Sequence, residues 1–299
     1  LTAGSKEITL HGAEATQTIG LGTATTNMDI SDVELGKLTA SADLTIGSAT
    51  SGSMAVDGVT DGNSDTIGSL TVIATNAAAT VSFITAASVF NKGITVQAAK
   101  GITLEQDVTT VNGAVNLNGD SNSADNSLDT IQASDAVTLN AGTELTLAAG
   151  NGGLLALGKL TLAAKKGVYI TDHLKTALSA KGLVINADSD STGSTGTLTV
   201  ASTKTVTSNK SDVTITAFDV DMSGSLTAGS KEITLHGSFA TQTIGLGTTT
   251  TTMDISDAEL GKLTASADLT IGSADSGSMT VDGVTDGNSD TIGSLTVIA

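Results

Sequence analysis

Residues 94–104 read ITVQAAKGITL, and this stretch contains the pattern that decides the fold. Two triplets, Ile94-Thr95-Val96 and Ile102-Thr103-Leu104, each place a threonine between two aliphatic residues, and a Lys-Gly pair lies between the triplets. Apolar and polar residues that alternate with a period of two, rich in β-branched side chains, are typical of a strand with one buried face. The glycine marks a corner. We therefore expect very short strands, each burying about two side chains, joined by tight turns.

The same triplet recurs along the whole chain. Further examples are Ile8-Thr9-Leu10, Leu44-Thr45-Ile46, Leu70-Thr71-Val72, Val137-Thr138-Leu139, Leu160-Thr161-Leu162, Leu198-Thr199-Val200 and Val213-Thr214-Ile215. Strands this short do not build a sandwich with a deep core, but they suit a solenoid in which each coil stacks on the next. We predict an all-β fold, a right-handed parallel β-helix (β-solenoid), with coils of roughly 20–25 residues.

Two segments predict helix instead of strand. Residues 31–36 have the spacing of a capping box followed by glycine, which predicts one helical turn at a corner. Residues 171–180 predict a short helix that Thr171 caps.

A long internal repeat organises the chain. Residues 1–74, called copy 1 here, return as residues 226–299, called copy 2, at an offset of 225 and with seven differences among 74 aligned positions. The differences are Ala13/Ser238, Glu14/Phe239, Ala24/Thr249, Asn27/Thr252, Val33/Ala258, Thr50/Asp275 and Ala55/Thr280. We divide the chain into one full repeat unit, residues 1–225, and the start of the next near-identical unit, residues 226–299. The solenoid is expected to continue across both, each unit advancing on the order of 50 Å at about 4.8 Å per stacked strand.

Composition narrows the functional classes. The chain has 299 residues with 13 lysines, 31 acidic residues and a net charge of −18, and it contains no Cys, Pro or Trp. Without cysteine, these residues form no disulfide and no thiolate site. The negative charge argues against nucleic acid, whose phosphates are neutralised by Lys and Arg, and against an anionic membrane surface. No apolar run approaches the roughly 20 residues of a membrane span, so we expect no membrane insertion.

Part of the repeat resembles a known family. Ile19-Gly20-Leu21-Gly22, the stretch MDISDVELGKLTA at residues 28–40, and Leu44-Thr45-Ile46-Gly47 are similar to repeats of the filamentous-haemagglutinin-like large exoproteins of bacteria. Copy 2 carries the same motifs, and the resemblance covers about residues 15–74 and 240–299. It implies a right-handed parallel β-helix secreted to the bacterial surface that serves as an adhesin, a contact-dependent toxin or a surface fibre. Secretion and toxin domains of that family are not recognisable in these residues.

The candidate ligand-binding residues are acidic and amide side chains crowded into glycine-rich turns. They are Asp57, Asp61, Asn63 and Asp65, the equivalent Asp282, Asp286, Asn288 and Asp290, and a third group of Asp120, Asn122, Asp125 and Asp129; Asp188 and Asp190 make a smaller cluster. Oxygen ligands close together on a turn suit Ca²⁺, and no other cofactor is expected. The spacing is not that of the twelve-residue Ca²⁺ loop, and solvated Asx turns explain the same residues.

Catalytic candidates are few. His11 and His236 occupy the same position in the two copies and suggest a role in a turn or at an edge. His173 follows Asp172, which permits a base with an orienting carboxylate, but no nucleophile lies in an activating context nearby. Tyr169 is expected on the outer face of a strand. Glu14 and Phe239 share one position, which predicts an exposed site.

Three functions follow as hypotheses. The first is a non-catalytic structural repeat region of a giant secreted bacterial filament or adhesin. Its partners would be further copies of the repeat, neighbouring filaments that associate laterally, and cell surfaces or glycans. The second is a polysaccharide-active β-helix enzyme, disfavoured because the chain has no Arg or Trp and one Tyr. The third is an ice-binding or surface-binding solenoid with outward threonine rows, which would need a flat Thr-x-Thr array on every coil.

Overall fold

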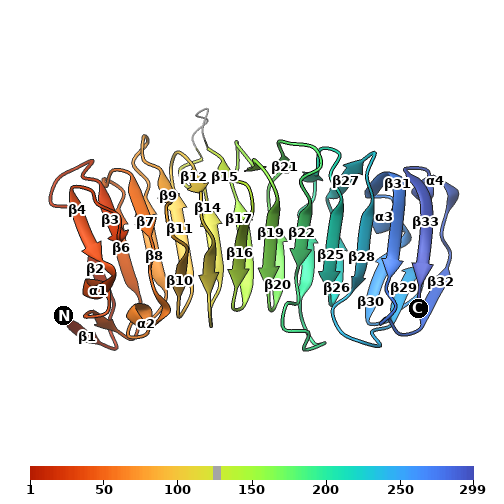
Figure 1. Cartoon of the computed structure of the whole chain (residues 1–299), viewed down its shortest axis with the longest axis horizontal. Helices are drawn as coiled ribbons and strands as arrows, with labels where there is room; N and C mark the ends of the chain where they lie inside the picture. The colour runs from red at the N-terminus through yellow and green to blue at the C-terminus, as the bar shows by residue number, and fades with distance from the viewer. Residues whose placement is uncertain (124–128) are drawn as a thin grey trace. The chain divides into compact units, whose positions relative to one another are not determined.

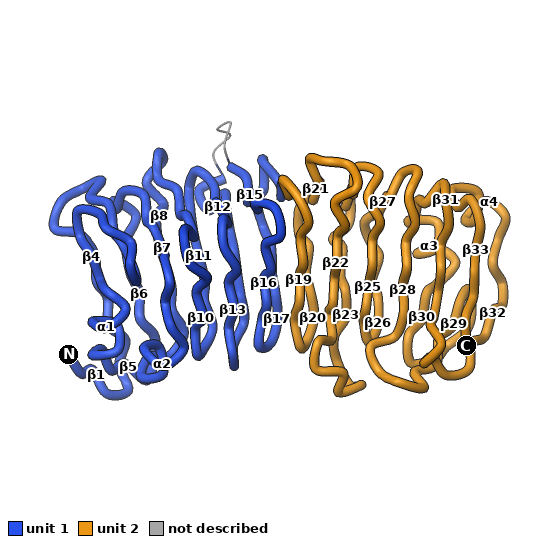
Figure 2. The backbone as a smooth tube through the Cα atoms, in the orientation of Figure 1, with its two compact units in different colours: residues 1–155 blue, residues 156–299 orange. Residues whose placement is uncertain are grey.

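The computed structural model describes residues 1–123 and 129–299. These residues form two compact units, residues 1–155 and 156–299 (Figure 2). Each unit is a stack of short parallel strands (Figure 1), so the predicted all-β parallel solenoid is confirmed. Strand β18 (Leu154–Ala156) contains the division between the units, and copy 2 begins inside the second unit.

In the first unit, most coils give one strand to each of three ladders. The first ladder is β2 (Ile8–Leu10), β6 (Leu44–Ser48), β8 (Leu70–Ala74), β11 (Ile94–Ala98), β14 (Val115–Asn118) and β17 (Glu144–Ala148). The second is β3 (Ile19–Gly22), β7 (Met54–Asp57), β9 (Val81–Phe83), β12 (Ile102–Leu104) and β15 (Ile131–Ala133), with β4 (Met28–Ser31) on the free side of β3. The third is β10 (Ser88–Phe90), β13 (Val108–Thr110) and β16 (Val137–Ala141), while β1 (Thr2–Gly4) pairs with β5 (Thr39–Ala40).

The second unit uses the same plan. One ladder is β20 (Gly167–Ile170), β23 (Thr197–Val200) and β26 (Asp219–Met222), and another is β21 (Leu174–Thr176), β24 (Thr205–Thr207) and β27 (Ser225–Gly229). A third is β19 (Leu160–Ala164), β22 (Leu183–Asn186), β25 (Val213–Ala217) and β28 (Ile233–Gly237). The long β31 (Leu263–Gly272) pairs with both β27 and β28 and is followed by β33 (Ile292–Ile298). A separate three-stranded sheet holds β29 (Ile244–Gly247), β30 (Met253–Ser256) and β32 (Met279–Asp282).

The in-register pairing of adjacent strands explains how the apolar core is built. Leu44, Leu70 and Ile94 are partners on adjacent strands, and all three side chains are buried. The threonines between such residues point outward and align equally well. Because like residues stack on each other from coil to coil, each coil is stabilised by its neighbours and not by one central core. Phe83 and Phe90 are the largest of the fully buried side chains.

Two sequence expectations about local structure need correction. Strands β6, β8 and β11 begin at residues 44, 70 and 94, near the expected coil length, but β2 begins at residue 8, so the first coil takes 36 residues. The extra length accommodates β4 and a helical turn. Residues 171–180 are not a helix: they contain the strand β21, in which Leu174 and Thr176 are buried on one face and Leu174 aligns with Val206. Burial with a period of two outweighed the local capping signal.

The capping-box prediction is confirmed. Helix α1 (Asp32–Leu35) has Ser31 as its N-cap, and the Ser31 and Glu34 side chains each bond the other's backbone amide. Helix α3 (Asp257–Leu260) repeats this in copy 2, and both copies add a second turn, α2 (Asp61–Ser64) and α4 (Asp286–Ser289). Glycine is required at the last residue of β3: Gly22 has φ of +85°, and a Cβ there would lie 2.0 Å from the Asp57 carbonyl oxygen.

Candidate functional site

The first acidic turn is held together by bonds within the chain. The Asp57 carboxylate accepts from Thr23 Oγ1 at 2.6 Å and from the Ala86 amide at 2.8 Å, and its side chain is buried. Asp61 accepts from Asn91 Nδ2 at 3.0 Å. The carboxylates therefore fasten this turn to the next coil. Asp65, at the end of α2, is exposed.

A carboxylate that the sequence did not single out organises this corner. Asp32 accepts from the Thr60 amide at 2.9 Å, from Thr60 Oγ1 at 2.8 Å and from Asn63 Nδ2 at 2.6 Å. It thereby joins α1 to α2. The signal available in the sequence was that the repeat preserves both partners.

Copy 2 reproduces this corner with one difference. Asp257 accepts from the Thr285 amide and from Asn288 Nδ2 at 2.8 and 2.7 Å, and these bonds lower the pKa of Asp257. Asp282 accepts from Thr248 Oγ1 at 2.8 Å but is exposed. The bond that the Ala86 amide donates to Asp57 lies outside the stretch that the two copies share, because Ala86 follows residue 74. Asp286 and Asp290 begin and follow α4.

The third acidic turn is described only in part. Asp120 is buried and accepts from the Asn151 amide at 3.1 Å, Asn122 is exposed, Asp129 is buried, and Asp125 lies outside the described residues. Among the residues that the structure describes, no three His, Asp or Glu side chains come close enough to hold a metal ion. Calcium binding at these turns stays a prediction.

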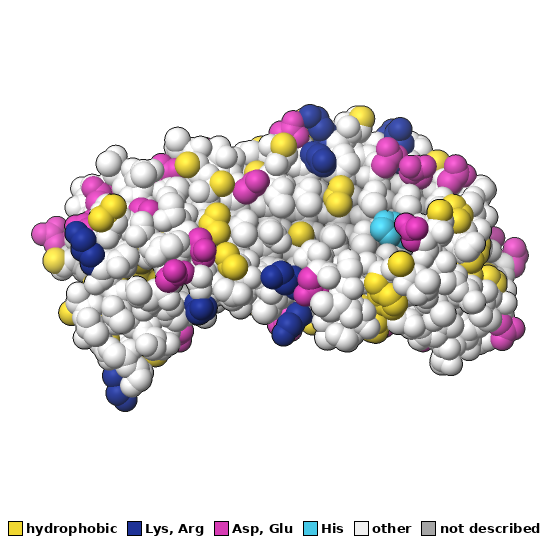
Figure 3. Space-filling model, turned by 60° about the horizontal axis from the view of Figure 1, so that its bottom comes forward, with side chains coloured by type: hydrophobic (Ala, Val, Ile, Leu, Met, Phe, Trp, Pro, Cys, Tyr) yellow, Lys and Arg dark blue, Asp and Glu magenta, His cyan; other side chains and the backbone are white. Residues whose placement is uncertain are grey.

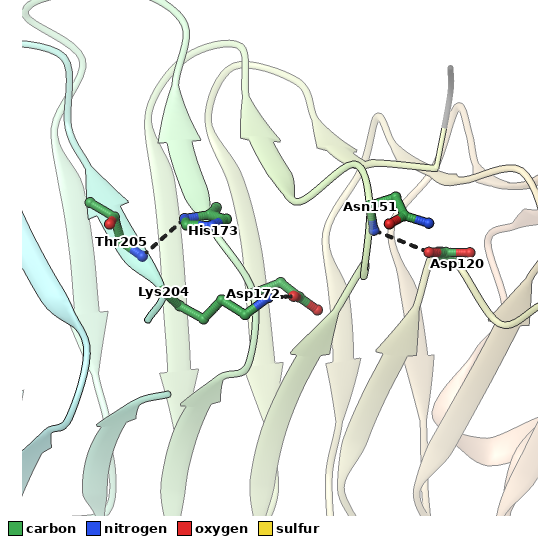
Figure 4. Close-up of polar contacts among 6 residues, drawn as sticks. All are labelled: Asp120, Asn151, Asp172, His173, Lys204 and Thr205. Atoms are coloured by element: carbon green, nitrogen blue, oxygen red, sulfur yellow. Dashed lines mark hydrogen bonds and ion pairs between the residues drawn. The ribbon is translucent and has the colours of Figure 1, made fainter. Parts of the chain in front are cut away.

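The Asp172-His173 pair does not have the geometry of a base with its orienting carboxylate. Figure 4 shows the two side chains engaged with different partners. Asp172 forms an ion pair with Lys204 at 2.5 Å, and His173 Nδ1 accepts from the Thr205 amide at 3.1 Å. Both residues thus link one coil to the next.

The other candidate residues also have structural partners. His11 and His236 each contact the carbonyl of the following glycine through Nδ1, at 2.9 and 3.0 Å. His236, which lies in β28, also contacts Thr216 Oγ1 through Nε2 at 3.2 Å. Tyr169 lies on the outer face of β20 opposite Thr199, as expected.

One open groove of about 650 Å³ lies in the first unit. Its charged residues are Asp43, Asp65 and Lys92, and no aromatic residue lines it. Asp43 accepts from the Ser69 amide at 3.0 Å, and Lys92 Nζ donates to Asn91 Oδ1 at 2.6 Å. The groove therefore lacks a stacking platform for a sugar ring.

Outward threonines form single files. Thr9, Thr45, Thr71 and Thr95 align on β2, β6, β8 and β11, and Thr214, Thr234, Thr270 and Thr296 align in the second unit. The parallel outward row of the first unit contains Ile73, Gln97 and Asn118. A row one threonine wide is not the flat Thr-x-Thr array that surface binding would need.

The most informative surface is the edge where a copy begins, which we call the head: residues 1–35, with β1, β2, β4 and α1, in copy 1 and residues 226–260, with β27, β28, β30 and α3, in copy 2. In copy 2, β27 pairs with β24 and β28 pairs with β25. Leu226 is consequently 0 % exposed, whereas the equivalent Leu1 is 72 % exposed. The same sequence thus occurs once with a preceding coil over its head and once with that head open.

The edge where a copy ends, the tail, shows the opposite contrast. Leu70 in copy 1 is covered by β11 and is 1 % exposed, whereas Leu295 in β33 is 38 % exposed. Val281 and Val297 are exposed as well, although Val56 and Val72 are buried. Each edge therefore occurs once with a neighbouring coil over it and once without one.

Polar contacts join the head of copy 2 to residues 186–222, and we call this junction the seam. Gln242 Nε2 donates to the Phe218 carbonyl at 2.7 Å, Glu259 Oε1 accepts from the Met222 amide at 3.1 Å, and Asp219 Oδ1 accepts from the Asp254 amide at 3.1 Å. Burial raises the pKa of Asp219, and the charges of Glu259 and Asp254 add to this. Sequence reasoning missed these residues, because their partners come from a different part of the repeat.

The face drawn in Figure 3 gives no second candidate. On the face drawn in Figure 3, acidic side chains are spread out with lysines among them, and they do not gather in one patch. In the part of the chain that the structure describes, no helix is long and apolar enough to span a membrane.

No protein-family model matches this chain, and no curated protein or solved structure matches it either.

Proposed function

We propose that this chain is a non-catalytic structural repeat region of a giant secreted bacterial filament or adhesin. In this role the repeat forms an elongated extracellular fibre or stalk for contact with cell surfaces or other cells. The partners of each repeat are the neighbouring repeats of the same chain, and filaments associate laterally.

The observation that carries the proposal is the seam. The head of copy 2 receives a preceding coil through two strand pairings and three side-chain bonds to the backbone. The tail of copy 2 exposes the apolar residues that the next coil covers in copy 1. A unit that is covered on both sides only by its neighbours is a unit that extends by repetition, as in other solenoids.

The absence of a catalytic constellation among the described candidates supports a mechanical role. The side chains of Asp172, His173 and Asp57 each bond a residue of the adjacent coil. The acidic charge and the resemblance of residues 15–74 to bacterial exoprotein repeats support a location outside the cell.

Chains with one, two and three additional 225-residue periods test the fibre. Electron micrographs are expected to show particles of constant width whose length increases by on the order of 50 Å per period. Compact particles whose width grows with the number of periods would contradict the proposal.

Labelling of intact bacteria tests the location. An antibody against residues 75–225 should bind unpermeabilised cells or the culture medium. A signal that appears only after lysis would contradict an extracellular role.

A further inference from the structure

Two of the seven differences between the copies lie at the seam. Copy 1 has Ala13 and Glu14 where copy 2 has Ser238 and Phe239. The shared position of Glu14 and Phe239 predicted an exposed site, and that prediction holds for Glu14 only: Phe239 is half-buried. Both copy 2 side chains contact the segment that precedes copy 2: Ser238 contacts Asp188, and Phe239 contacts Phe218 and Gly193.

Ser238 satisfies a buried carboxylate. Its Oγ donates to Asp188 Oδ2 at 2.6 Å, and Asp188 is 0 % exposed. Burial raises the pKa of Asp188, and the bond from Ser238 opposes that rise. An alanine at this position, as in copy 1, has no donor, and a buried carboxylate that loses a donor is destabilised.

Phe239 completes an apolar contact. Its ring stacks on Phe218 with 6.4 Å between the centroids and 21° between the planes. The ring also packs over Gly193, where an added Cβ would lie 3.1 Å from it. A glutamate at this position would place a second carboxylate against an aromatic ring, next to the residue that contacts Asp188, and its desolvation would not be compensated.

We propose that Ser238 and Phe239 form a selective joint, which fits the head of a copy only to a preceding segment that carries Asp188 and Phe218. Copy 1, with Ala13 and Glu14, does not fit such a segment. The inference rests on the array proposed above and adds an order to it. Gln242, Asp254 and Glu259 are shared by the copies as Gln17, Asp29 and Glu34, so they join any two units. Ser238 and Phe239, which only copy 2 carries, decide which copy follows which segment.

Selection of this kind counters a hazard of near-identical repeats. Copies that match at almost every position compete for the same edge, both within one chain and between chains. Specificity then needs an element that penalises the wrong pairing as well as one that rewards the right one. Glu14 disfavours pairing with the wrong segment, and Ser238 and Phe239 stabilise pairing with the right one.

The first experiment exchanges the pair in the full 299-residue chain. S238A/F239E gives copy 2 the residues of copy 1, and the matched control A13S/E14F gives copy 1 those of copy 2. We expect S238A/F239E to lower the unfolding midpoint of the C-terminal unit by about 5 °C and to speed amide exchange at residues 186–196. The control should leave both unchanged, because Ala13 and Glu14 are exposed. Equal effects of the two exchanges would overturn the proposal.

The second experiment separates selectivity from ordinary packing. F218K supplies a cation to the glutamate of F239E, so F218K/F239E should recover at least half of the midpoint lost in F239E alone. Likewise, D188A should reduce the loss caused by S238A. If the loss in unfolding midpoint of each double variant equals the sum of the losses of its two single variants, the side chains fill space without selecting a partner. Amide exchange of residues 94–118 in the first unit confirms that each variant is folded.

These measurements use a single chain and do not depend on fibre length. If multi-repeat particles are compact but the paired substitutions at the seam are non-additive, the proposed fibre is wrong and the selective joint stands. If the particles are long but the substitutions at the seam are additive, the fibre stands and the selective joint is wrong.

Discussion

At the scale of single residues, the two copies form a natural experiment in which one sequence has two environments. Asp57 and Asp282 occupy the same position, but only Asp57 is covered by a following coil. The sequence predicted an acidic cluster at both sites. Only the neighbouring coil makes the first carboxylate a structural anchor.

Removal of these carboxylates should therefore have unequal effects. Asp57→Ala leaves the Ala86 amide without its acceptor and removes the shorter of the two bonds that the Thr23 hydroxyl donates to Asp57, which is 6 % exposed. We expect a loss of about 1–3 kcal/mol in the free energy of unfolding. Asp282→Ala is the matched control and should cost much less. Denaturant titrations compare the two, and a loss from Asp282→Ala as large as that from Asp57→Ala would contradict this account.

Asp219 gives a prediction about pH. Burial and the neighbouring Glu259 and Asp254 raise its pKa in the folded state. An acid whose pKa is raised on folding contributes stability that is complete below its unfolded pKa, about 3.9, and is lost as the pH rises through the folded pKa. Asp219→Asn, which keeps an acceptor for the Asp254 amide, should therefore raise the melting temperature at pH 7 and give no gain near pH 3.

The control for this variant is Asp221→Asn, which removes one charge from the same strand at an exposed position. Melting curves between pH 3 and 7 compare the two variants. If Asp221→Asn stabilises the chain as much as Asp219→Asn does, the effect comes from net charge and not from the seam.

At the scale of elements, the strands are too short to be stable alone. The free energy of unfolding that is lost when a strand is perturbed therefore depends on how many neighbouring strands it has. Strand β8 lies between β6 and β11, whereas the equivalent β33 has β31 on one side. The side chains of β8 alternate between buried and partly exposed, and nearly all those of β33 are exposed.

Leu70→Ala and Leu295→Ala measure this difference on one sequence. Leu70 is 1 % exposed, so its truncation should cost about 2–5 kcal/mol by loss of burial and creation of a cavity. Leu295 is 38 % exposed, so its truncation should cost less than half as much. Equal losses in denaturant titrations would mean that β33 is covered in solution. Adding one more coil after residue 299 should make the two losses similar.

At the scale of the whole molecule, charge is the dominant long-range term. One repeat, residues 1–225, carries 11 lysines and 22 acidic residues. At an expected length on the order of 50 Å, neighbouring charges lie within the Debye length of about 8 Å. Filaments should therefore repel each other unless cations intervene.

Calcium removal tests the remaining prediction about the acidic turns. We expect Ca²⁺ to increase light scattering by multi-repeat chains and to raise their melting temperature, and a chelator at constant ionic strength to reverse both. Sodium chloride of equal ionic strength is the control and should act weakly. If scattering and melting temperature are the same with Ca²⁺ and with chelator, the turns serve only the bonds between coils described above.

The sequence by itself determined the local rules of this protein. Triplets such as Ile94-Thr95-Val96 fixed the strands and their buried faces, because a period of two leaves one choice of face. The spacing from Ser31 to Glu34 fixed the helical turn, because both capping partners lie within four residues. The repeat at an offset of 225 predicted stacked, near-identical units.

Only the tertiary structure decided what depends on contacts between coils. Residues 171–180 became a strand because Leu174 stacks on Val206, and Asp57 became an anchor because Ala86 lies on the following coil. The seam joins Asp188 to Ser238 and Phe218 to Phe239, pairs 50 and 21 residues apart, across turns of unequal length. Coil lengths vary from one turn to the next, so spacing along the chain does not reveal which polar residues meet. That meeting is set by the stacking register, which only the folded chain defines.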